Sequence, residues 1–77
     1  MTSIVVGLLF AVGYPTAIVL VARFPAVVRT RRTGLFLLHE AIMVAIATGW
    51  ALLGQPVGVA LNGAWCAAAA AWWFWPR

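Results

Sequence analysis

Charged side chains are confined to a few places in this chain of 77 residues, and the stretches between them are mostly apolar. Four of the five arginines lie between residues 23 and 32, the fifth is Arg77, and Glu40 is the single acidic residue. Each of the three apolar stretches that remain has about the 20 residues that a helix needs to cross the roughly 30 Å hydrocarbon core of a bilayer. The sequence therefore predicts membrane-spanning helices over residues 3–23, 35–53 and 57–75.

The composition argues against a soluble fold. Hydrophobic residues make up 66% of the chain and charged residues 8%, whereas a soluble domain carries roughly 25% charged residues. Cys66 is the single cysteine, so no internal disulfide can stabilise a small soluble core. We expect an all-α integral membrane protein in which residues 1–77 form one small bundle of helical hairpins.

A cleavable signal peptide is the alternative for the first apolar stretch. Such a peptide starts with basic residues, whereas here the arginines follow the stretch. We therefore expect an uncleaved helix, and Pro15 should kink it.

The arginines predict the orientation of the chain, because basic residues near the ends of spans stay on the cytoplasmic side. The basic loop over residues 24–34 should be cytoplasmic, with the N-terminus outside and the C-terminus inside a bacterial inner membrane. Tryptophans near the C-terminus are typical of an aromatic belt at the headgroups, although a partner-binding surface is a second interpretation. The residues expected to set topology or to anchor the chain in lipid are Arg23, Arg29, Arg31, Arg32, Trp72, Trp73, Trp75 and Arg77.

Small residues recur every four positions in each apolar stretch, which allows helices to approach closely in lipid. The residues expected to pack in this way are Gly7, Ala11, Ala41, Ala45, Gly49, Gly63, Ala67 and Ala71. They are suited equally to contacts within one chain and to contacts between copies, and both interpretations stay open.

Three polar side chains fall inside the predicted spans: His39, Glu40 and Asn62. A carboxylate within a span costs a few kcal/mol unless it is paired or hydrated, so Glu40 marks either a structural ion pair or a proton site. The nearby arginines favour the ion pair. His39 should point about 100° away from Glu40 around the helix, and Asn62 should form a hydrogen bond to another helix.

The residue inventory argues against catalysis and against metal or cofactor binding. The chain has no Asp, no Lys, one His and one Cys, too few for a metal cluster or a nucleophile with its relay. The net charge of +4 is explained by topology and anionic lipids, so nucleic acid is not an expected partner.

The order of features in the chain resembles that of small three-span phage holins. These features are a first span, the basic RTRRTG segment at 29–34, a second span opening LFLLHE, a very short turn and a third span ending at Arg77. The Lys-free composition, rich in Ala, Val and Arg, is similar to that of membrane proteins from actinobacteriophages. The resemblance implies accumulation in the host inner membrane, self-association and concerted permeabilisation or depolarisation. An accessory or inhibitory subunit of a larger membrane complex is the alternative, and a minimal ion or proton pathway is a weaker one. The expected partners are membrane lipids and either further copies or such a complex.

Overall fold

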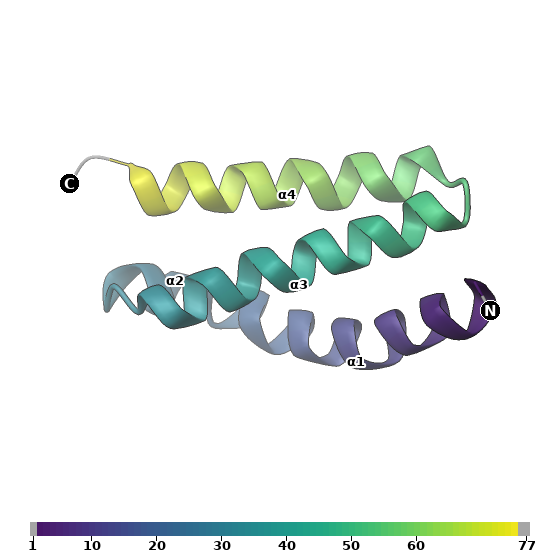
Figure 1. Ribbon diagram of the computed structural model, residues 1–77. Coiled ribbons are helices and arrows are strands. Elements are labelled where there is room, and N and C mark those ends of the chain that lie inside the picture. The colour runs from purple at the N-terminus through teal and green to yellow at the C-terminus, as the bar shows by residue number, and fades with distance from the viewer. Residues whose placement is uncertain (1, 76–77) are drawn as a thin grey trace.

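The computed structural model describes residues 2–75, which contain four helices. They are α1 (Thr2–Ala22), α2 (Phe24–Arg29), α3 (Thr33–Leu52) and α4 (Pro56–Phe74) (Figure 1). Three of them, α1, α3 and α4, are long and apolar enough to cross a membrane, as predicted, and they begin and end within two residues of the predicted bounds. The described part of the chain is all-α and has the make-up of a multi-pass membrane protein.

α1 continues through Pro15 without interruption, and Figure 1 shows it as a curved helix. Proline has no amide hydrogen, so the carbonyl of Ala11 lacks its usual partner within the helix. The hydroxyl of the next residue, Thr16, donates to the carbonyl of Val12 at 2.8 Å, a type of contact that often bends helices. The expected kink therefore takes the form of a bow and not of a break.

The connection between the first two spans, predicted as a loop, contains the short helix α2. Pro25 lies in its first turn, where a missing amide hydrogen costs nothing. Phe24, Val27 and Val28 lie on one side of α2 and are buried. This apolar side packs against α3 and α4, so the connection is part of the core.

The turn between α3 and α4 is as tight as the sequence predicts. Gly54 has a φ of +70°, a conformation that glycine adopts without a steric penalty. The amide of Gln55 donates to the carbonyl of Trp50 at 3.0 Å, which ends α3 in a Schellman motif. Pro56 then starts α4.

In the view of Figure 1, α3 lies between α1 and α4, and each of these two helices packs against α3. This arrangement measures 44 × 20 × 16 Å. We call the end that holds α2, the start of α3 and the end of α4 the basic end, and the opposite end the turn end. Because α1 and α4 pack mainly against α3, most of the surface of these two helices is left without a partner in the described part of the chain.

Two groups of buried side chains hold the helices together. At the basic end, the fully buried Phe24 packs among aromatic rings from α3 and α4, with ring centroids 4.5 Å from His39 and 5.9 Å from Trp65. Further towards the turn end, Ala17 of α1 packs with Met43 and the fully buried Ile46 of α3. The core is therefore densest where α2 covers α3 and α4.

Candidate functional site

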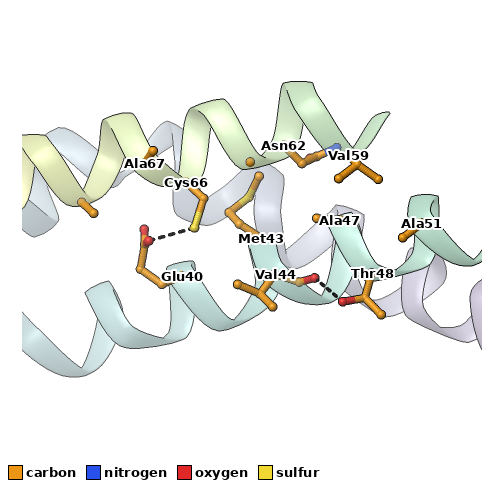
Figure 2. Close-up of a pocket in the computed structure, with 12 residues that line it drawn as sticks. Glu40, Met43, Val44, Ala47, Thr48, Ala51, Val59, Asn62, Cys66 and Ala67 are labelled. Carbon is orange, nitrogen blue, oxygen red and sulfur yellow. Dashed lines mark hydrogen bonds between the residues drawn. The ribbon is translucent and has the colours of Figure 1, made fainter. Parts of the chain in front are cut away.

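An open groove runs between α3 and α4 and encloses about 540 Å³. We call it the α3–α4 groove. Figure 2 shows that Glu40 and Met43 reach into it from α3 and that Cys66 and Asn62 reach into it from α4. The residues that line it are Glu40, Met43, Val44, Ala47, Thr48, Ala51, Val59, Asn62, Gly63, Cys66, Ala67 and Ala70. Most of them are small or apolar, so its few polar groups stand out.

Glu40 is the charged residue of this groove. It lies seven residues after the start of α3, about 10 Å along the helix at 1.5 Å per residue. Its Oε2 accepts a hydrogen bond from the Cys66 thiol at 2.9 Å, which is drawn in Figure 2, and its Oε1 lies 3.0 Å from Nδ1 of His39. The side chain is 20% exposed, so the carboxylate joins two helices and still reaches the groove.

The hydrogen bonds of His39 define its tautomer. The indole N–H of Trp65 can only donate, and it lies 2.9 Å from Nε2 of His39. Nε2 must therefore be the unprotonated acceptor, and the ring proton sits on Nδ1, from which it is donated to Glu40. A doubly protonated imidazolium would have to break the bond to Trp65. His39 is 1% exposed, so this neutral ring acts as a buried link between Glu40 and α4.

The expected ion pair between Glu40 and an arginine is wrong for the described residues. The carboxylate pairs with His39 and Cys66, while the guanidinium of Arg31 binds the backbone of α4. The expectation that His39 and Glu40 diverge is also wrong, since Nδ1 of His39 lies 3.0 Å from Oε1 of Glu40. Consecutive side chains start about 100° apart, but two flexible ones can still meet.

Asn62 also differs from its prediction. Its amide Nδ2 donates to the carbonyl of Gly58 at 2.7 Å, one turn earlier in α4. The bond is thus within the helix and not between helices, because a short side chain can reach its own backbone more easily than a distant partner. Asn62 is half-buried and faces the groove.

Of the three glycines among the eight small residues predicted to pack helices, Gly49 makes the closest contact. A Cβ added there would lie 2.6 Å from Cε1 of Phe10. Ala45 is half-buried, and Ala41 is exposed. The predicted stripes of α1 and α4 are exposed within the single chain, namely Gly7 and Ala11, and Gly63, Ala67 and Ala71. Any helix packing by those five residues requires a contact with another molecule.

Two close approaches were missed because the four-residue pattern does not include them. An added Cβ at Gly13 would lie 3.1 Å from Cγ1 of Ile46, and one at Gly58 would lie 2.5 Å from Cγ of Trp50. The indole N–H of Trp50 in turn donates to the hydroxyl of Tyr14 at 2.8 Å. Trp50 of α3 therefore contacts both α1 and α4. The sequence feature that could have predicted these close approaches is a single glycine that faces a bulky side chain of another helix.

Some of the predicted lipid anchors are exposed, and others make contacts within the chain. Trp73 is buried, stacked on Phe36 with ring centroids 4.5 Å apart, so its assignment to an aromatic belt is wrong. The Arg31 guanidinium lies 4.0 Å from the centre of the Trp73 ring and donates to its carbonyl at 2.8 Å. The predicted anchors Arg23, Arg29, Arg32, Trp72 and Trp75 are exposed. Arg77 lies outside the described residues.

The groove thus combines a carboxylate, a thiol and an amide on an open surface between two helices. Within residues 2–75, no group of three or more His, Cys, Asp or Glu side chains is placed to hold a metal ion. The chemistry that this arrangement offers is proton exchange and hydrogen bonding at Glu40. No protein-family model, curated protein or solved structure matches this chain.

Proposed function

We propose that this chain is a holin-like protein that self-associates in the bacterial inner membrane and permeabilises or depolarises it. Glu40 carries this proposal, because a partly exposed carboxylate lies in an open groove well inside a helix long enough to span the bilayer. A charged residue at the centre of a membrane helix costs about 2.5–3.5 kcal/mol on insertion scales. Covering the groove with further copies, or filling it with water between copies, relieves that cost.

The exposed small residues of α4 support association through the same groove. Gly63 and Ala67 line it, and apart from the neighbouring backbone of α4 itself no described atom lies within 4 Å of a Cβ added at Gly63. A helix from a second copy can therefore approach the backbone of α4 closely, which favours association in lipid through van der Waals contacts. In such an assembly the polar groups of the groove face neighbouring copies or a shared aqueous lumen.

The proposed orientation follows from the basic end. Arg23, Arg29 and Arg32 are exposed there, and arginines flanking spans remain on the cytoplasmic side. With three spans, the turn end and the start of α1 then face outwards.

The test uses two neighbouring alanines of α4 that differ in one respect. Both Ala67 and Ala68 are exposed, but Ala67 lines the α3–α4 groove and Ala68 does not. Ala67→Leu should abolish association, measured by energy transfer between labelled copies in liposomes, and should prevent collapse of membrane potential when the chain is induced in bacteria. Ala68→Leu adds the same bulk and should leave both properties intact at equal amounts of inserted protein.

Two other results would overturn the proposal. If the wild-type chain leaves the membrane potential unchanged, the accessory or inhibitory subunit becomes the better explanation, with the groove holding a helix of another protein. If Ala67→Leu and Ala68→Leu have equal effects, the groove is not the association surface.

A proton pathway is a second candidate, favoured by the contact of the partly exposed Glu40 carboxylate with Nδ1 of His39. Neither oxygen of Glu40 is held by an arginine in the described part of the chain, so its charge is not fixed by a permanent counter-ion. Glu40→Gln keeps an oxygen that can accept from Cys66 or His39. If the pathway exists, this variant should insert normally and lose proton flux in liposomes. Equal flux in wild type and variant would exclude Glu40 as a proton carrier.

A further inference from the structure

A second recess, at the basic end, is lined by two arginines. It encloses about 280 Å³ between α2 and the start of α3. We call it the basic cleft, and its lining residues are Arg23, Ala26, Val27, Thr30, Arg32 and Leu35. It lies apart from the α3–α4 groove and shares no lining residue with it.

The backbone fixes the two arginines on either side of one buried residue. The amide of Val27 donates to the carbonyl of Arg23 at 3.0 Å, and the carbonyl of Val27 accepts from the amide of Arg32 at 3.1 Å. Val27 is 3% exposed, so this junction is part of the packed core. The positions from which both guanidinium groups extend are therefore set by the fold.

Arg31 does not contribute to the cleft, although it precedes Arg32 directly. Its φ of +54° turns the chain, and its guanidinium lies over Trp73. Within residues 2–75, Arg23 and Arg32 form no salt bridge to an acidic side chain. Arg31 therefore binds α4, whereas its neighbour Arg32 lines the cleft. Together with Arg23, Arg32 gives the cleft two positive charges and no acidic side chain among its lining residues.

Thr30 limits which groups can hold a ligand in the cleft. Its hydroxyl hydrogen is already donated to the carbonyl of Ala26 at 2.7 Å, so its oxygen can only accept a further bond. Ala26, Val27 and Leu35 supply apolar walls. Donors for a ligand therefore come from the guanidinium groups, and the ligand that suits them is an anion.

We propose that the basic cleft binds a phosphate group, supplied by the headgroup of an anionic phospholipid. The planar forks of arginine match the oxygen atoms of phosphate and form short, charge-assisted hydrogen bonds. The cleft lies where α1 ends and α3 begins, the level at which a spanning helix leaves the hydrocarbon and meets the headgroups. This is a defined site for one headgroup, in addition to the diffuse attraction that any basic loop has for an anionic surface.

The experiment compares lipid retention by the full chain in detergent, using native mass spectrometry. Phosphatidylglycerol and phosphatidylcholine with the same acyl chains are offered together. The wild type should prefer the anionic lipid by about tenfold, and Arg23→Gln or Arg32→Gln should each remove most of that preference. Arg29→Gln is the matched control, because Arg29 is exposed in the same connection and does not line the cleft; it should change the preference by less than about twofold.

A lysine variant separates loss of charge from loss of shape. Arg32→Lys keeps the charge but not the fork, so it should recover only part of the preference at the helix content of the wild type, checked by circular dichroism. A second arm adds millimolar inorganic phosphate, which should not displace the lipid because it lacks the acyl chains.

Three results would contradict the proposal. Equal losses in Arg23→Gln, Arg32→Gln and Arg29→Gln would mean that only the total charge of the connection matters. Full displacement by inorganic phosphate would assign the cleft to a free anion and not to a lipid. A wild type that shows no preference would remove the site altogether.

Discussion

At the scale of single residues, two glycines of α4 differ in the space around them. A Cβ at Gly58 would lie 2.5 Å from Cγ and 3.0 Å from Cβ of Trp50. Apart from the neighbouring backbone of α4 itself, no described atom lies within 4 Å of a Cβ at Gly63. Alanine is favoured over glycine in a helix by about 1 kcal/mol, and overpacking costs about 1–3 kcal/mol. Gly58→Ala should therefore lower the free energy of unfolding by up to about 2 kcal/mol, and Gly63→Ala should raise it slightly. Titration of the monomer from mild detergent into dodecyl sulfate, followed by tryptophan fluorescence, measures both. A stabilising Gly58→Ala would show that Trp50 moves aside freely.

The same scale shows where prediction of the site from sequence stops. Residue type alone identified His39, Glu40 and Asn62 as the polar groups within the spans, because each is costly there. Their partners could not be predicted, since these depend on how α3 and α4 are rotated about their axes. If α4 were shifted by one residue relative to α3, His39 and Glu40 would face residues other than Trp65 and Cys66. The burial of Trp73 depended on the same rotation.

At the scale of elements, the end of α4 is held to the α2–α3 connection by Arg31. Its guanidinium contacts the Trp73 ring and carbonyl, an interaction of about 1–2 kcal/mol from the cation–π and hydrogen-bond terms together. Arg31→Asn removes both contacts but keeps a residue that tolerates a positive φ. Amides in the last turn of α4 should then exchange hydrogen about tenfold faster, while Arg29→Asn leaves them unchanged. Unchanged exchange in Arg31→Asn would show that stacking on Phe36 alone holds the turn.

Long elements were predictable and the short one was not. Twenty apolar residues in a row allow few alternatives in lipid, so the spans follow directly from length and hydropathy. α2 was overlooked because Pro25 and the arginines are typical of loops. The helical spacing of Phe24, Val27 and Val28 was visible in the sequence, but an isolated helix of six residues has too little stability to be inferred without its packing.

At the scale of the whole molecule, the proposed orientation can be measured directly. In a chain carrying Cys66→Ser, which retains a hydrogen-bond donor to Glu40, single cysteines replace Thr2, Thr30 or Gln55. An impermeant thiol reagent added to intact cells should label positions 2 and 55, because the turn end faces outwards, and position 30 should react after permeabilisation. A reporter fused after Arg77 should be active only in its cytoplasmic form. Labelling of position 30 in intact cells would reverse the assignment.

The central position of α3 among the long helices has a consequence for how such a sequence changes over generations. α3 touches both neighbours and contains Ile46 and His39, which are almost entirely enclosed, whereas the buried residues of α4 are Ala69 and Trp73. Apart from the small residues that the proposed association requires, substitutions on the outward sides of α1 and α4 exchange one apolar group for another in lipid and meet little selection. Homologous sequences should therefore diverge fastest in α1 and α4, and residues 33–52 should be the most conserved part of the chain.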